Sequence, residues 1–348
     1  MRTFQRDGVR SVLVLRLYFV GDVLLSTPVL AALRAGLPDA RIDVLVKRRA
    51  APVLERSPHV DEVILYDEPE RYHNPVWMCR LAARLRGARY DLAVDLTGDH
   101  RSSLLLAAAD PGFRTGLNHC GMGFLLDRRI PYRSDGHVVD HLLRSVEALG
   151  LGPEDRAPVL VLGEEEVDAS RGILRDAGID PPEPFVALSP GANWPPRRWP
   201  AERFGALASR IRTGLGLRSA VLGSRSDADI ATAVVEASRG DATSLAGKTG
   251  LRTLAGVASL ATVFVGNDSG PMHVAASQGT PVVALFGPNT PRRYAPRGAP
   301  SEVLWSPTDC APCAQKRCVR ASDRCMERIS VDDAYEAVAS LLADGGRP

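Results

Sequence analysis

The sequence has no uninterrupted hydrophobic run of the length that crosses a membrane. Its most apolar early stretch, 12–33, is broken by Arg16 and by Gly21-Asp22, whereas a spanning helix needs about 20 consecutive apolar residues. The same region lacks a convincing signal-peptide cleavage site. We therefore expect a cytoplasmic protein.

An excess of one charge is also missing. The formal net charge of the 348 residues is +2, which is too small to predict nucleic-acid binding. A short basic cluster at Lys47, Arg48 and Arg49 is more typical of a solvated surface than of a binding patch. Hydrophobic residues at 45% and charged residues at 24% are usual for a soluble globular protein, and the length predicts about two domains.

Cysteine is scarce, and four of the six cysteines lie together as Cys310-x2-Cys313-x4-Cys318-x6-Cys325. A disulfide framework does not suit a reducing cytosol. Such a cluster could hold structural zinc, but it contains one C-x-x-C only and its second half is unequally spaced. A loop of reduced cysteines is the simpler interpretation, and we therefore predict no metal site. The pattern leaves the zinc alternative open.

Several catalytic motifs are absent. No G-x-G-x-x-G follows an expected strand and no G-x-S-x-G occurs, which weighs against a dehydrogenase or an esterase. The segment 242–249 resembles a phosphate loop, but Ala242 replaces its first glycine. A D-x-D spacing occurs at Asp227-Ala228-Asp229, in what reads as the start of a surface helix.

Short apolar runs alternate with helical patterns, which predicts parallel βαβ units. Strands are expected at 11–15, 42–46, 62–66, 91–96, 185–188, 220–223, 262–265 and 282–286. Helices are expected after Thr27-Pro28 and at 137–149, 201–211, 227–238, 272–278 and 331–342. A proline-rich segment, 150–184, marks the expected domain boundary.

The first candidate site is Gly21-Asp22, where an apolar strand ends and a helix begins. Ligands of open α/β sheets bind beyond the carboxyl ends of the strands. Asp22 is thus a candidate general base, although an aspartate at this place could also cap the helix.

The second candidate site is the loop 189–200, again directly after an apolar strand. A turn at Gly191 would expose backbone N–H groups, and the guanidinium groups of Arg197 and Arg198 suit phosphate oxygens. This pattern indicates an anion site. The alternative is a proline-stiffened loop whose tryptophans pack between the domains.

The third candidate site joins an apolar strand to a helix at 265–273. Free N–H groups near Ser269 and Gly270 would hold a diphosphate at the positive end of the helix dipole. Asp268 suits sugar hydroxyls rather than phosphate. His273, one turn into the helix, could donate to a phosphate oxygen or fill a packed corner.

Taken together, these motifs resemble the bacterial heptosyltransferases, glycosyltransferase family 9, from near residue 11 to near residue 343. The matching segments are 21–28, 90–96 with Arg101-Ser102, 189–192 with 198–200, 245–249, 266–276, 281–288 and the cysteine pattern.

The resemblance implies a GT-B fold, in which two Rossmann-like parallel-sheet α/β domains face each other across a cleft. Residues 1–165 would receive the acceptor, 180–330 would hold the nucleotide sugar, and 331–348 would pack back on the first domain. The implied reaction is inverting and metal-independent and needs no cofactor. It moves heptose from ADP-heptose to the inner core of lipopolysaccharide.

Carried over by position, Asp22 matches the base and Arg197 would meet the charge of the leaving group. The expected donor contacts are Ser189, Gly191, Ala192, Thr249, Asp268, Ser269, Gly270 and His273.

Acceptor contacts are expected at Tyr18 and Arg101. Two residues depart from the family pattern: Arg197 stands where many members have lysine, and Tyr18-Phe19 is bulkier than usual, which bears on the acceptor. A lipid-linked acceptor would also bring the chain into peripheral contact with the inner membrane. The rival hypotheses are another nucleotide sugar as donor, an epimerase, or a non-catalytic sugar-nucleotide binding protein.

Overall fold

The computed structural model describes residues 4–66, 75–153, 155–313 and 316–343. The chain divides into two compact units, Met1–Val161 and Leu162–Pro348, and the division falls inside the proline-rich segment 150–184. Each unit is built on its own six-stranded sheet, in which all neighbouring strands are parallel. The expected α/β fold class is confirmed.

The first unit has the strand order β3-β2-β1-β4-β5-β6. Its strands are β1 (Ser11–Arg16), β2 (Arg41–Lys47), β3 (Glu62–Tyr66), β4 (Leu92–Asp95), β5 (Phe113–Asn118) and β6 (Arg128–Pro131). Its helices are α1 (Val20–Leu24), α2 (Thr27–Gly36), α3 (Pro75–Gly87), α4 (His100–Ala109) and α5 (Val138–Glu147), with short 3₁₀ turns η1 (Arg48–Val53) and η2 (Gly123–Leu125).

The second unit has the order β12-β11-β10-β7-β8-β9. Its strands are β7 (Phe185–Ser189), β8 (Arg218–Val221), β9 (Ala242–Ser244), β10 (Val263–Asn267), β11 (Val282–Phe286) and β12 (Ser301–Trp305). Its helices are α6 (Glu164–Asp176), α7 (Ala201–Leu215), α8 (Ala228–Ala237), α9 (Leu251–Leu260), α10 (Gly270–Ser277), α11 (Pro291–Tyr294) and α12 (Val331–Ala343). Three 3₁₀ turns accompany them: η3 (Pro195–Arg197), η4 (Arg225–Asp227) and η5 (Cys325–Arg328).

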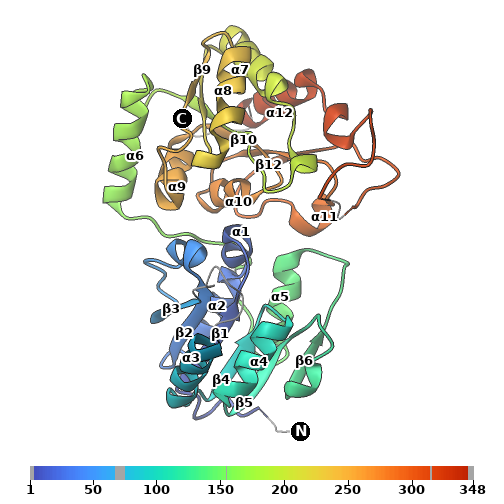
Figure 1. The fold of residues 1–348 in the computed structure, drawn as a ribbon. Coiled ribbons are helices and arrows are strands. Elements are labelled where there is room, and N and C mark those ends of the chain that lie inside the picture. The colour runs from blue at the N-terminus through green and yellow to red at the C-terminus, as the bar shows by residue number, and fades with distance from the viewer. Residues whose placement is uncertain (1–3, 67–74, 154, 314–315, 344–348) are drawn as a thin grey trace. The chain divides into compact units, whose positions relative to one another are not determined.

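Helices cover both faces of each sheet (Figure 1). In the first unit α3 packs with α4, and α2 packs with α5; in the second, α7 packs with α8 and α12, and α9 packs with α6 and α10. Because both faces are covered, the central strands are mostly apolar, and every residue of β7 is buried, including Ser189 at its end. The core of the second unit includes Trp199 and Phe204, whose rings meet edge to face.

Both units share one connection order. Counted from its own first strand, each sheet runs 3-2-1-4-5-6, so the chain reverses its direction of travel between β1 and β4 and again between β7 and β10. This reversal separates the loops that follow the two central strands. Sheets of this kind usually bind their ligands at the carboxyl ends of these two strands.

The helix α12 belongs to the second unit, where it packs against α7 and against β10, β11 and β12. Its apolar face, with Ala334, Val338 and Leu341, is part of that unit's core. The further contact with the first domain that the resemblance implies stays a prediction, and residues 344–348 of the expected C-terminal segment lie outside the described residues.

Candidate functional site

Asp22 lies in the first turn of α1, directly beyond the carboxyl end of β1. Its Oδ2 accepts a hydrogen bond from the backbone N–H of Phe19 at 3.3 Å, so the side chain also caps the helix. Its Oδ1 lies 3.5 Å from Nη2 of Arg16, and the side chain keeps 31% of its exposure. The carboxylate is therefore held in place by Arg16 and by the Phe19 N–H and is open to solvent on one side, as a general base must be.

Tyr18 lies beside Asp22 and under the guanidinium of Arg16, which is 5.0 Å from the ring centre. Burial raises the pKa of the Tyr18 hydroxyl; nearby Arg16 lowers it, and Asp99, Asp22 and Asp95 raise it. The net direction is upward, so Tyr18 stays a neutral hydroxyl, and its OH donates to the Thr97 carbonyl at 3.4 Å.

Arg101 stands at the start of α4, and its Nη2 donates to Oδ2 of Asp99 at 2.7 Å. Asp99 in turn caps α4 by accepting from the Ser102 N–H at 3.0 Å. The charge of Asp99 also raises the pKa of the Tyr18 hydroxyl, so Asp99 and Tyr18 are neighbours. The structure thus brings Tyr18, Asp22 and Arg101 to one edge of the first sheet.

Sequence reasoning missed two buried charged groups at this edge. Arg16 was visible only as a charge that interrupts an apolar run, and Asp95 only as part of the segment 90–96. Asp95 is fully buried and accepts from the N–H groups of Thr97 and Gly98 and from the Ser102 hydroxyl, at 2.9, 3.0 and 2.8 Å. Burial raises its pKa to about 6. The signal in both cases was a charge at the end of a buried strand.

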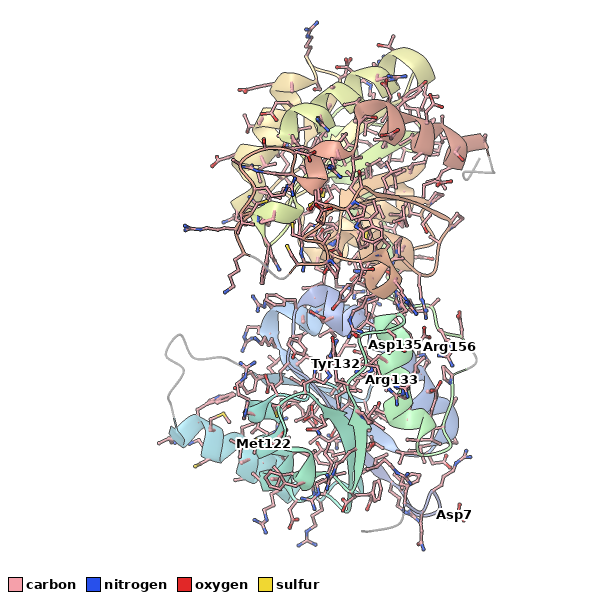
Figure 2. All side chains as sticks on the ribbon, turned by 90° about the vertical axis from the view of Figure 1, so that its right-hand side faces the viewer. Asp7, Met122, Tyr132, Arg133, Asp135 and Arg156 are labelled. Carbon is pink, nitrogen blue, oxygen red and sulfur yellow. The ribbon has the colours of Figure 1, made fainter. Side chains whose placement is uncertain are left out.

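An aromatic cluster follows the ends of β5 and β6, and the sequence did not single it out. Figure 2 labels Tyr132 in the first unit. Its ring packs edge-on against His119 and His141, with centroids 4.8 and 5.5 Å apart. Since His119 and Tyr132 each follow a strand, this cluster extends the same carboxyl edge of the first sheet.

In the second unit, the loop after β7 is fixed by Asn267 at the end of β10. The Asn267 Oδ1 accepts from the Trp199 N–H at 3.0 Å, and its Nδ2 donates to the Pro190 carbonyl at 2.7 Å. Gly191 leaves room for the Asp227 carboxylate, because a Cβ at this position would lie 2.8 Å from Oδ1 of Asp227, which would have to move. The loop with Ser189, Gly191 and Ala192 is thus held against the third candidate segment.

Asp268 is nearly buried and already has partners. Its Oδ2 accepts from Nδ2 of Asn289 at 2.7 Å and lies 3.4 Å from Nη1 of Arg197. The structure therefore brings Arg197 next to Asp268, with the Arg197 side chain 30% exposed. Because Arg197 contacts Asp268 and is also partly exposed to solvent, its guanidinium can receive an anion.

Two hydroxyls of the second unit are buried without a hydrogen-bond partner among the described residues: Oγ of Ser269 and Oγ1 of Thr249. Ser269 precedes the first residue of α10, Gly270, and His273 lies buried one turn further on. Thr249 follows β9. Buried hydroxyls without partners cost free energy, and the predicted donor contacts of Ser269 and Thr249 stay predictions.

The four clustered cysteines line one cavity of about 170 Å³ in the second unit, together with Pro196 and Pro288. All six cysteines of the chain are free thiols, and burial raises the pKa of the Cys325 thiol. Within the described ranges, no three His, Cys, Asp or Glu side chains are arranged to hold a metal ion. The prediction of no metal stays a prediction. Nor does any helix in those ranges have the length and apolar character that a membrane span needs.

Known proteins are similar to this chain over nearly its whole length. The model of glycosyltransferase family 9 (heptosyltransferase) matches residues 78–322. Lipopolysaccharide heptosyltransferase 2 of Salmonella typhimurium is 27% identical, over 97% of this chain and 99% of its own. Lipopolysaccharide heptosyltransferase 3 of Escherichia coli is also 27% identical, over 83% and 84%.

Two solved structures have the same fold. A family 9 glycosyltransferase from Veillonella parvula superposes with a TM-score of 0.86, at 26% identity, over 98% of this chain and 99% of its own. The ADP-heptose lipopolysaccharide heptosyltransferase II of E. coli gives 0.77, at 25% identity, over 97% and 100%.

Fold and comparisons together define a glycosyltransferase of the GT-B class. The chain belongs to glycosyltransferase family 9, the heptosyltransferases.

Proposed function

We propose that this chain transfers heptose from ADP-heptose to a hydroxyl of the lipopolysaccharide inner core, with inversion at the anomeric carbon. The first unit would receive the acceptor, and the second would hold the nucleotide sugar. The names and full-length coverage of the relatives support this donor and this acceptor. The observation that carries the proposal is Asp22, a partly exposed carboxylate at the carboxyl end of a central strand.

In this mechanism Asp22 takes the proton of the acceptor hydroxyl. The acceptor oxygen then attacks the anomeric carbon, the bond from that carbon to the diphosphate breaks, and ADP leaves. Positioned base catalysis typically contributes about a hundred- to ten-thousand-fold.

The charge of the leaving diphosphate would be met by Arg197 and by the start of α10. The N–H groups of Ser269 and Gly270 and the helix dipole favour an anion there, and His273 can donate from the next turn. Ser189, Gly191 and Ala192 would follow the diphosphate along the loop after β7, and Thr249 would contact the nucleotide base. Fixed donors of this kind stabilise a developing charge without a metal ion.

We also propose peripheral contact with anionic membrane, because the acceptor is amphiphilic. Arg48 and Arg49 on η1 are exposed, and the Arg49 guanidinium lies over the ring of Phe19, 4.4 Å from its centre. Phe19 is 43% exposed and immediately precedes α1. Vesicle flotation at low salt tests the contact; absence of binding to anionic vesicles would count against it.

The test of the function is heptose transfer from ADP-heptose to a heptose-deficient lipopolysaccharide core, followed by mass spectrometry in the presence of EDTA. Wild type should transfer, and Asp22→Ala should lose about a hundredfold or more of the rate. Asp39→Ala, which removes an exposed carboxylate of the same unit, is the matched control and should keep full activity. Transfer by Asp22→Ala at the wild-type rate would refute the base, and no transfer to any truncated core would refute the donor or the acceptor.

A further inference from the structure

A buried arginine ends the central strand of the first sheet. Arg16 is 3% exposed, while the four residues before it, 12–15, are apolar and fully buried. Burying a cation costs several kcal/mol, and the protein recovers that cost only when the charge is paired and hydrogen-bonded. An apolar side chain would fill the same space without that cost, so the arginine is not explained by packing.

The guanidinium of Arg16 holds Asp22 at two points. Its Nε donates to the Asp22 backbone carbonyl at 3.2 Å, and its Nη2 lies 3.5 Å from Oδ1 of the Asp22 carboxylate. A third nitrogen, Nη1, donates to the carbonyl of Leu96 beyond β4. The planar guanidinium fork of arginine holds its donors on three nitrogens in a fixed geometry, which the single nitrogen of lysine does not offer.

These contacts lie where the connection order of the sheet reverses. β1 and β4 are neighbours in the sheet, but the chain leaves them in opposite directions. Arg16 therefore ties the start of α1 to the loop after β4, across the crevice in which such sheets bind ligands.

We propose that Arg16 is the positioning residue of the general base: it fixes the Asp22 carboxylate in the orientation from which it accepts the proton. This inference rests on the proposed function. With Oδ1 facing Arg16 and Oδ2 bonded to the Phe19 N–H, the side chain is held at both oxygens. A displacement of about 1 Å at a reacting group can cost about a hundredfold in rate.

Steady-state kinetics of heptose transfer test the role. In Arg16→Met, kcat should fall about 10- to 100-fold while the KM values of donor and acceptor change by less than about twofold. Arg16→Lys should recover part of the rate, because it keeps the charge but loses the fork. Adding Arg16→Met to Asp22→Ala should cost nothing further, since the base is already absent.

The matched control is Tyr90→Phe. It removes another buried hydrogen bond of the same unit, from the Tyr90 hydroxyl to Oδ2 of Asp43 at 2.8 Å, at the opposite end of β4 from the candidate site. It should keep the wild-type kcat. An equal loss of kcat in Tyr90→Phe and Arg16→Met would mean that Arg16 has a structural role only. A rise in KM without a fall in kcat would mean the same.

A second measurement needs no activity. Hydrogen exchange of the Phe19 amide, which donates to Asp22, and of the Val23 amide, which donates to the Phe19 carbonyl, should be faster in Arg16→Met than in wild type or Tyr90→Phe. Unchanged exchange would overturn the inference. If the wild type transfers no heptose, the proposed function fails, and the exchange result still decides whether Arg16 holds Asp22.

Discussion

At the scale of single residues, Asp95 has the best-defined electrostatics of the first unit. It is fully buried, and three donors surround its carboxyl group, yet burial outweighs them and raises its pKa from 3.8 to about 6. Because the folded pKa lies above the unfolded value, ionisation of Asp95 opposes folding. Its stabilising contribution is complete below about pH 4 and is lost as the pH rises through about 6.

Asp95→Asn should remove this pH dependence. Because the folded pKa of Asp95 is raised to about 6, the wild type should lose on the order of 1 kcal/mol of unfolding free energy at Asp95 between about pH 5 and about pH 7.5. The asparagine can still accept from Thr97 and Gly98. Unfolding in urea, monitored by hydrogen-exchange mass spectrometry of a peptide covering β4, measures the unfolding free energy of both proteins at each pH. The same pH slope in both would show that Asp95 does not titrate as described.

At the scale of the elements, burial decided what could be predicted from sequence. The strands expected from continuous apolar runs are present, as β1, β2, β3, β4, β7, β8, β10 and β11. The expected strand at 220–223 is found two residues earlier, at Arg218–Val221. Its first two residues, Arg218 and Ser219, are polar, so the apolar run did not reveal where the strand begins. The strands that sequence reasoning missed, β5, β6, β9 and β12, are short or polar. β6 has one buried residue and β12 has none, so neither carries the apolar run that marks a covered strand.

The helix α12 gives the prediction at this scale. Val338 is fully buried and Tyr335 contacts Gly214 of α7, while the guanidinium of Arg210 lies 4.6 Å from the centre of the Tyr335 ring. Val338→Ala should destabilise the second unit by about 2 kcal/mol, through lost burial and the cavity it leaves.

Urea unfolding followed by tryptophan fluorescence reports on this unit, because three of the four tryptophans, Trp194, Trp199 and Trp305, belong to it. Glu336→Ala changes an exposed position of the same helix and should alter the unfolding free energy by less than about 0.5 kcal/mol. Equal effects of the two substitutions would mean that α12 is not part of the folded core in solution.

At the scale of the molecule, the two sheets place different candidate site residues at the same point of the same strand order. In the first, the reversal between β1 and β4 carries Asp22 and Arg16; in the second, the reversal between β7 and β10 carries Ser189 and Asp268. Spacing along the chain located Asp22, Ser189 and Asp268, because each follows or ends an apolar run. It could not reveal the bond from Arg16 to the Leu96 carbonyl, which joins residues 80 positions apart.

Binding of ADP should protect the second unit selectively. In hydrogen exchange, the largest slowing is expected in peptides covering 187–200, 245–253 and 266–276, where the proposed donor contacts lie. At about a hundred times its dissociation constant, ADP should add about 2.7 kcal/mol of stability, and UDP and GDP should add less. Slowing confined to residues 11–25, or a larger shift with UDP, would reject the proposed donor site or the ADP donor.

Among the described residues, neither sheet borrows a strand from the other unit, and this separation bears on how the chain folds as it is made. The last strand of the first sheet ends at Pro131, before the second unit begins at Leu162. Ribosomes add about 5–20 residues per second, so the 187 residues of the second unit, 162–348, take roughly 10–40 s to appear. The first unit therefore has its own strand-pairing partners well before those residues are complete, and it can fold while the second unit is still being translated.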